Sequence, residues 1–202
     1  MNKLLPAVVL CLAALAAPGL ASAVEFGTVL PEKSSIGFVS KQMGVAVNGK
    51  FPKFTAQVAF DPAKPEMAKV SISVDTAATD AGSKDANDEV VGKQWFNVRM
   101  FPTATFTSTS VKPAGPGKYE ITGSLSIKGK SQPVVAPFTF RADGASGVFE
   151  GGFVVKRIDF AIGEGSWTDV SMVANDVQVN FRIVASAAPP SPATARPAAK
   201  SK

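Results

Sequence analysis

Three carboxylates in the C-terminal part of the chain are the side chains best suited to bond-breaking chemistry. They are Glu164, Asp169 and Asp176. Two carboxyl groups that face each other could cleave a glycosidic bond, one as an acid and the other as a base or nucleophile. Glu164 stands between two glycines, however, and Asp176 follows Asn175, a composition that is ordinary for turns. A carboxylate-based hydrolase is therefore the weaker interpretation.

The amino-acid composition excludes most other catalytic systems. The sequence contains no His and a single Cys, Cys11. Without His, neither a Ser–His nor a Cys–His nucleophile system can form. Without His and with one Cys, the usual nitrogen and sulfur ligands of zinc are missing as well. We therefore expect no enzymatic activity, no catalytic residue, no metal site and no cofactor.

Four further residues could hold the polar head of a ligand. Arg157 and Asp159 flank Ile158, which would place both on one side of a strand, and Arg is well suited to phosphate. Trp167 could stack on a ring, and Lys41 could supply a second cation. A structural ion pair and a Trp that seals one end of the fold are the alternatives, and both stay open at this point.

The two ends of the chain have the composition of segments outside the fold. Residues 1–23 combine a basic start, an apolar run and the sequence Ala21-Ser22-Ala23, which predicts a secretory signal peptide cleaved near Ala23. The apolar run is too short for a membrane span. Residues 185–202 are rich in Ala and Pro and predict a disordered basic tail, which could touch an anionic membrane surface weakly. The mature protein is therefore expected in the periplasm or outside the cell.

The basic character of the chain comes from these ends. Of 21 Lys and Arg residues, Lys3, Arg196, Lys200 and Lys202 lie in them, which leaves 17 cations against 16 anions over residues 24–184. Binding to nucleic acid requires a clustered basic face, which a nearly neutral body does not predict. We expect no nucleic-acid partner.

Residues 24–184 have the pattern of a single all-β domain. Short runs rich in Val, Ile, Thr and Phe alternate with turn residues, and we expect an antiparallel eight-stranded barrel, which leaves no exposed sheet edge. The expected strands are 34–42, 45–50, 53–60, 70–76, 103–111, 119–128, 133–141, 147–162 and 177–185. One short helix is expected after Ser83 or Asp85 as N-cap, with Val91, Trp95 and Val98 on one face, packed across a barrel end.

The inward face of this barrel is expected to be apolar and contains several small residues. In "YEITGSLSIKG" (119–129), Gly123 falls among the inward positions, where a core normally needs volume. The small residues either make room for Phe rings from across the barrel or leave a tunnel, and both interpretations stay open. A tunnel lined by Phe would suit a long aliphatic or isoprenoid chain. Its expected lining is Phe38, Ile72, Val74, Phe106, Ile121, Gly123, Leu125, Phe138, Phe140, Phe153, Val179 and Phe181.

Four stretches in order resemble the YceI-like family of exported, lipocalin-like proteins that bind polyisoprenoids. They are "SSIGFVSKQMGVAVNGKFPKF" (34–54), "FPTATFTSTSV" (101–111), "YEITGSLSIKGKSQPV" (119–134) and "KRIDFAIGEGSWTDVSMVANDVQVNF" (156–181). The resemblance covers about residues 26–183.

This resemblance implies a lipocalin-like barrel that carries, stores or sequesters an isoprenoid lipid, such as a quinone or a polyprenyl phosphate. A homodimer is a family-level expectation. Many members carry His near the first strand, where this chain has Lys33 and the segment 40–42, so a head-group role of those His residues does not transfer. A barrel filled by its own side chains that serves as a protein-interaction module remains the alternative function.

Overall fold

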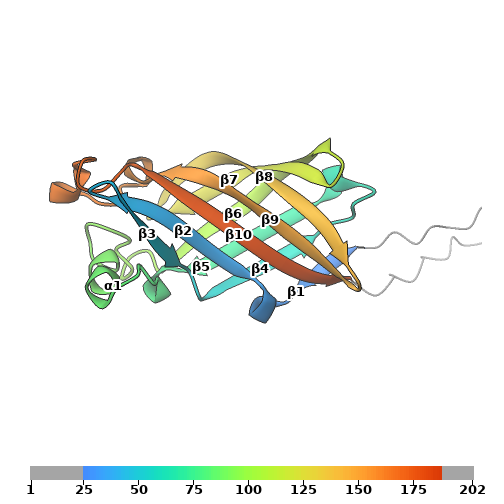
Figure 1. The fold of residues 1–202 in the computed structure, drawn as a ribbon, viewed down its shortest axis with the longest axis horizontal. Helices are drawn as coiled ribbons and strands as arrows, with labels where there is room; N and C mark the ends of the chain where they lie inside the picture. The colour runs from blue at the N-terminus through green and yellow to red at the C-terminus, as the bar shows by residue number, and fades with distance from the viewer. Residues whose placement is uncertain (1–24, 188–202) are drawn as a thin grey trace, which may run out of the picture.

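The structure, a computed structural model, describes residues 25–187 as a single antiparallel sheet curled into a barrel (Figure 1). Its strands are β1 Phe26–Val29, β2 Ser35–Gln42, β3 Val45–Lys50, β4 Phe54–Ala59, β5 Lys69–Asp75, β6 Thr103–Gly115, β7 Lys118–Ile127, β8 Lys130–Asp143, β9 Ser146–Lys156 and β10 Asp176–Ala187. The α-helix is α1 Lys84–Val90. Short 3-10 helices cover Pro31–Lys33 (η1), Pro65–Met67 (η2), Thr76–Ala78 (η3), Arg157–Phe160 (η4) and Gly165–Thr168 (η5).

The all-β antiparallel barrel with one short helix is confirmed, although the sheet contains ten strands instead of eight. Hydrogen bonds connect the strands in the order β3-β2-β10-β9-β8-β7-β6-β5-β4, and β1 pairs with β10. The difference in strand number has a simple origin. Residues 51–53 separate β3 from β4, so these two strands are halves of one broken strand, and β1 is a short addition. With β3 and β4 counted as one strand and β1 left out, the barrel wall therefore has eight strand positions.

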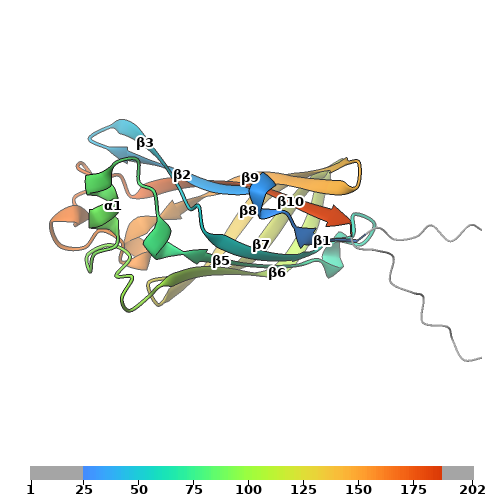
Figure 2. The same cartoon turned by 90° about the horizontal axis from the view of Figure 1, so that it is seen from below.

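The broken strand closes the barrel because its halves pair with opposite edges of the sheet. β3 pairs with β2, and β4 pairs with β5. Between them, the Phe51 N–H donates to the Ile36 carbonyl at 2.9 Å, and the Lys53 carbonyl accepts from Asp75 N–H at 3.0 Å. On one side of the break at residues 51–53, β1 fills the opening that the two half-strands leave between the edges of the sheet. On the other side the segment that contains α1 fills it (Figure 2).

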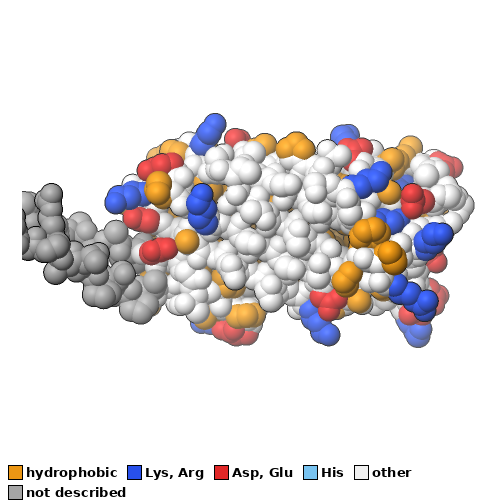
Figure 3. Space-filling view, turned by 180° about the vertical axis from the view of Figure 1, so that it is seen from behind, with side chains coloured by type: hydrophobic (Ala, Val, Ile, Leu, Met, Phe, Trp, Pro, Cys, Tyr) orange, Lys and Arg blue, Asp and Glu red, His pale blue; other side chains and the backbone are white. Residues whose placement is uncertain are grey.

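Alternation along the strands separates a dry face from a wet face, as predicted. In β7, Tyr119, Ile121, Leu125 and Ile127 are buried, whereas Glu120 and its outward neighbours are exposed or half-buried. On the face drawn in Figure 3, uncharged polar side chains and backbone form the middle of the wall, and charged side chains of both signs gather toward the two barrel ends. That face therefore has no continuous basic surface.

An aromatic cluster packs the barrel end at which β1 and the end of β10 lie. Phe60 is its centre, with ring centroids 5.3 Å from Tyr119, 4.9 Å from Phe140 and 5.1 Å from Phe149. Phe26 joins through Phe140 at 5.1 Å, and the backbones of Phe26 and Phe60 exchange two hydrogen bonds. We call these rings, with Phe138, the aromatic plug. They leave this end of the barrel solidly filled.

Several expected boundaries were wrong. The helix ends at Val90, so Val91, Trp95 and Val98 lie beyond it and do not form one of its faces. The strand expected over 147–162 ends at Lys156, because η4 begins at Arg157. Residues 185–187 were expected to belong to the tail but form the end of β10, and Ala185 is fully buried. The expected signal peptide and the remainder of the expected tail lie outside the described residues.

Gly123 is explained by packing against Phe106. A Cβ atom on Gly123 would meet the Phe106 ring and would lie 2.5 Å from the backbone carbonyl oxygen of Thr107. The Phe106 ring thus occupies the space that the missing side chain leaves, and the expectation that Gly123 itself lines a tunnel is wrong.

We predict that Gly123→Ala lowers the free energy of unfolding by about 1–3 kcal/mol, since both the ring and the strand backbone must shift. Denaturant unfolding of the purified protein measures this loss. Gly27→Ala is the matched control, because a Cβ there would lie 3.4 Å from the Val58 carbonyl, an ordinary contact. Equal stabilities of the two variants would contradict this account of Gly123.

Candidate functional site

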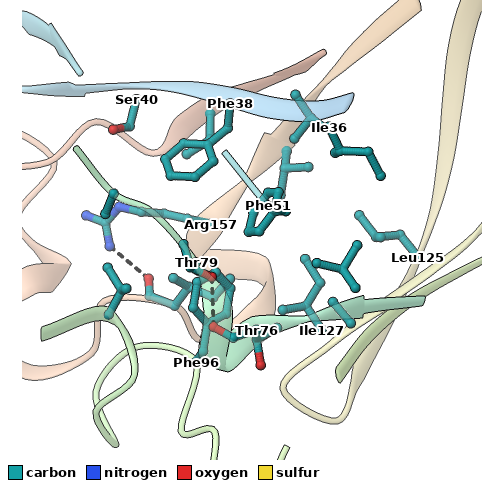
Figure 4. Close-up of a pocket in the computed structure, with 18 of the residues that line it drawn as sticks. Ile36, Phe38, Ser40, Phe51, Thr76, Thr79, Phe96, Leu125, Ile127 and Arg157 are labelled. Atoms are coloured by element: carbon teal, nitrogen blue, oxygen red, sulfur yellow. Dashed lines mark hydrogen bonds between the residues drawn. The ribbon is translucent and has the colours of Figure 1, made fainter. Parts of the chain in front are cut away.

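A cavity of about 590 Å³ lies inside the barrel between the aromatic plug and the end that carries α1. This volume is typical of sites that hold a small molecule or a lipid chain. Side chains from β2, β5, β6, β7, β8, β9 and β10 form its wall, and almost all of them are apolar. In Figure 4, Phe38 lies on one side of the cavity, and Thr76 and Phe96 lie on the other.

Ten of the twelve side chains expected to line a tunnel lie in this wall. They are Phe38, Ile72, Val74, Phe106, Ile121, Leu125, Phe138, Phe153, Val179 and Phe181. Several of them, such as Ile72 and Val179, are inward-facing yet only half-buried, because part of their surface borders the cavity. That these residues bind a ligand stays a prediction.

The other two expected lining residues lie elsewhere. Gly123 is covered by Phe106, as described above. Phe140 belongs to the aromatic plug, where its ring packs on Phe26, Phe60 and Phe149. Along β8, Phe140 is the next inward-facing residue after Phe138 and lies nearer to the filled end of the barrel. Alternation along a strand predicts that a residue faces inward, but it does not predict which end of the barrel is filled.

A group of polar and aromatic side chains surrounds the end of the cavity beside α1. We call this group the mouth. Its members are Ser40, Gln42, Ser83, Asp85, Glu89, Trp95 and Trp167. Ser83 is the N-cap of α1, as predicted, and accepts from the Ala86 N–H at 3.2 Å. Asp85 and Glu89 follow one turn apart on that helix, so both carboxylates reach the mouth. Neither carboxylate was among the expected site residues, although the helix was expected to pack across a barrel end.

Glu89 joins the two tryptophans of the chain. Its Oε1 atom accepts from Nε1 of Trp95 at 3.1 Å and from Nε1 of Trp167 at 2.9 Å. The two rings lie 5.5 Å apart between centroids. One carboxylate oxygen therefore holds together two segments that are far apart in sequence. Trp167, a candidate for stacking on a ligand, does lie at the cavity, as part of this arrangement.

Arg157 is buried beside the mouth, with 2% of its surface exposed, and is enclosed by backbone carbonyls. Its Nε donates to Ala174 O at 3.1 Å, and its two terminal nitrogens donate to the carbonyl oxygens of Ile162 (2.9 Å), Gly163 (3.1 Å), Trp167 (2.6 Å) and Val173 (2.7 Å). The guanidinium also lies 6.0 Å from the centre of the Trp95 ring. Burial lowers the pKa of Arg157. A guanidinium has five N–H donors, and all five of Arg157 are bonded to carbonyl oxygens of residues 162–174.

Asp159 and Lys41 lie outside the cavity wall. Asp159 is exposed on η4, so the expected shared strand face of Arg157 and Asp159 does not exist. The Lys41 side chain is exposed, and its backbone carbonyl accepts from the Ala174 N–H at 2.9 Å. The structure therefore brings together Arg157 and Trp167, and separates Asp159 and Lys41 from them.

The three carboxylates considered for hydrolysis are each engaged in a different contact. Glu164 Oε2 lies 2.8 Å from Lys128 Nζ, and this hydrogen bond lowers the pKa of Glu164. Hydrogen bonds from Ser171 lower the pKa of Asp169, and Asp176 lies 3.4 Å from Lys156. None of the three is in the cavity wall. A glycosidase acid needs a raised pKa, so this arrangement does not favour hydrolysis.

Within residues 25–187, no group of three or more His, Cys, Asp or Glu side chains is placed to hold a metal ion. Among the helices in that part of the chain, none has the length and apolar character needed to cross a membrane.

Fold and site together define a lipocalin-like barrel: an antiparallel wall of eight strand positions, filled at one end, with an apolar cavity that reaches the other. Comparison with known proteins gives the family. The family model of the YceI-like domain matches residues 28–185. The chain belongs to the YceI-like family.

Relatives and solved structures agree with this assignment. A UPF0312 protein of Azotobacter vinelandii is 38% identical over 120 residues, which cover 56% of this chain and 62% of that protein, a little under two thirds of its length. A UPF0312 protein of Vibrio cholerae is 29% identical over 88% of this chain and 100% of its own. The crystal structure of Burkholderia cenocepacia BcnA aligns with a TM-score of 0.76 and 46% identity, over 78% of this chain and 99% of that one.

One further structural relative shares the fold at low identity. It is a polyisoprenoid-binding domain from Saccharophagus degradans, with a TM-score of 0.59 and 14% identity, over 83% of this chain and 99% of that one.

We predict that Arg157→Lys lowers the free energy of unfolding by about 3 kcal/mol, because one ammonium cannot satisfy carbonyls on all sides and leaves several of them unpaired. Chemical denaturation followed by Trp fluorescence measures the change. Arg182→Lys is the control: Arg182 is more exposed and pairs with Glu150 at 2.9 Å, so its loss should cost less than about 1 kcal/mol. Similar losses in both variants would contradict the structural role of Arg157.

Proposed function

We propose that this protein is a non-enzymatic carrier or store that holds the long apolar chain of an isoprenoid or similar lipid inside the barrel. The observation that carries the proposal is the cavity of about 590 Å³, whose wall beyond the mouth is mostly Phe, Val, Ile, Leu and Ala. Such a wall offers few hydrogen-bond partners to a sugar or a nucleotide. It offers a flexible hydrocarbon chain a dry environment along the barrel axis.

The energetics suit a long ligand. Each buried CH₂ group contributes about 0.8 kcal/mol, so a chain that buries ten to fifteen such groups gains about 8–12 kcal/mol. Ordering and association take back several kcal/mol of that gain. Micromolar affinity corresponds to about 8 kcal/mol, so the chain must have well over ten carbons.

The family assignment supports the same conclusion. A domain with this fold, from Saccharophagus degradans, is described as polyisoprenoid-binding and as implicated in plant cell wall breakdown. An isoprenoid ligand, export to the periplasm or the medium, and a homodimer are parts of the proposal for this chain. The rival function, a filled barrel that docks other proteins, needs no internal space, and the cavity therefore weighs against it.

The first test identifies what the native protein contains. Protein purified without detergent is extracted with organic solvent, and the extract is analysed by mass spectrometry. We expect a lipid of more than ten carbons in substoichiometric to equimolar amount. An extract without lipid, together with failure of the purified protein to take up any prenol, would overturn the proposal.

A pair of Trp substitutions tests where the ligand lies. Val179 lines the cavity, and Val179→Trp places an indole in it, which should weaken prenol binding at least tenfold. Val154 lies on β9, is 51% exposed and points outward, so Val154→Trp should leave prenol affinity unchanged. Binding is measured by titration with radiolabelled prenol, after circular dichroism shows that both variants are folded. Equal affinities would place the ligand outside the barrel.

A further inference from the structure

The polar side chains in and beside the mouth differ in which hydrogen-bond donors and acceptors remain available to a ligand. The cation beside the cavity is Arg157, and its N–H donors are directed at carbonyl oxygens of residues 162–174. These carbonyl dipoles point their negative ends at the guanidinium and offset its field. A phosphate entering the mouth would therefore find no free N–H group on Arg157.

The other cation considered for a head group is also out of reach. Lys41 is exposed on the outer side of β2, while its neighbours Ser40 and Gln42 face the cavity. Alternation along a strand sends side chains of adjacent residues to opposite faces. The mouth of the described barrel thus presents no available lysine or arginine donor.

Two carboxylates, in contrast, do line the mouth. Asp85 and Glu89 both lie in its wall and are exposed. Glu89 uses Oε1 for the two indoles, and this contact fixes its position. Asp85 lies one helical turn earlier, in the first turn of α1. The remaining polar groups of the mouth are two carboxylates, which only accept, together with hydroxyls and one amide, which accept and donate but carry no positive charge.

Aromatic rings stand next to these carboxylates. Trp95 and Trp167 both line the cavity, with centroids 5.5 Å apart. Aromatic faces combined with carboxylates attract ammonium groups, since the ring quadrupole and the anion both favour positive charge. The same surroundings repel a phosphate.

We propose that the mouth selects the head group of the lipid by charge: it favours an ammonium head over a neutral hydroxyl, and a hydroxyl over a phosphate. This inference rests on the proposed function, because the apolar chain must occupy the cavity for its head to reach Asp85 and Glu89. The acidic side chains act here as specificity determinants of the cavity. They are not a separate site.

The test uses three probes with one chain and different heads: geranylgeranylamine, geranylgeraniol and geranylgeranyl phosphate. Delipidated full-length protein is titrated with each probe at neutral pH and low salt, below the micelle concentration, and Trp fluorescence reports binding. For charges at a partly exposed rim we expect the amine to bind about fivefold tighter than the alcohol, and the phosphate about fivefold weaker. Added salt should reduce both ratios.

Charge-removing variants locate the selectivity. Asp85→Asn should reduce the amine-to-phosphate affinity ratio about fivefold, and Glu89→Gln should reduce it while its amide oxygen still accepts from the indoles. Asp88→Asn is the matched control, because Asp88 lies on the same helix, pairs with Lys84 and is not in the cavity wall. It removes the same charge and should leave the ratio unchanged.

The outcomes separate the two proposals. If no probe binds, the proposed lipid-binding function fails, and the head-group inference fails with it. If all three probes bind but the phosphate binds as well as the amine, the lipid-binding function stands and the inference is overturned. A ratio that falls equally in Asp88→Asn and Asp85→Asn would also overturn it, since the effect would then come from overall charge.

Discussion

The contact of Phe60 with the rings around it determines how the interior of this barrel is used. Phe60 directly follows β4, exchanges two backbone hydrogen bonds with Phe26, and packs on Tyr119, Phe138, Phe140 and Phe149. Rings that bury this much surface dominate local packing, so one end of the barrel is dry and filled. An eight-position barrel has limited volume, and its filled part leaves the remaining inward residues facing each other across a space. The cavity and its single described mouth beside α1 follow from that asymmetry.

The opposite end depends on polar contacts between segments that local sequence does not connect. Glu89 on α1 holds Trp95 and Trp167, and the Trp167 carbonyl accepts from Arg157. Arg157 in turn bonds to several carbonyls of the loop before β10. These fixed carbonyl dipoles replace the water shell of the guanidinium, and the contacts stabilise the loop. Because its donors are occupied, Arg157 cannot bind another partner. Within residues 25–187, the shape of the mouth and the lack of a free cation in its wall have the same cause.

The sequence predicted the parts of the fold that depend on local periodicity. The apolar alternation of β5, β7 and β10 identified the inward residues, and Ser83, one of two N-cap candidates, marks the start of α1. The inward Phe residues suggested a long aliphatic or isoprenoid chain, and the resemblance to a family narrowed this to an isoprenoid. Ten of the twelve expected wall residues lie at the cavity because strand parity sets which face a side chain occupies.

The failures concern features that only the folded chain specifies. Gly123 and Phe140 have the inward parity, but whether an inward residue meets a ring or a space depends on strands distant in sequence. Arg157 and Asp159 have strand-like spacing, yet the chain turns into a 3-10 helix there and buries one of them beneath carbonyls. Asp85 and Glu89 could have been named from the helix, had its orientation over the barrel been known.

The pairing of β1 with β10 has a practical consequence. Phe26 lies opposite Ala187 in the register of these strands, at the end of the barrel farthest from α1 (Figure 1). Both ends of the folded body therefore leave it from one side, behind the aromatic plug. A linker attached at either end to a bead, a sensor chip or a second domain would present the cavity entrance to the solution, so that the cavity of the immobilised protein would stay open.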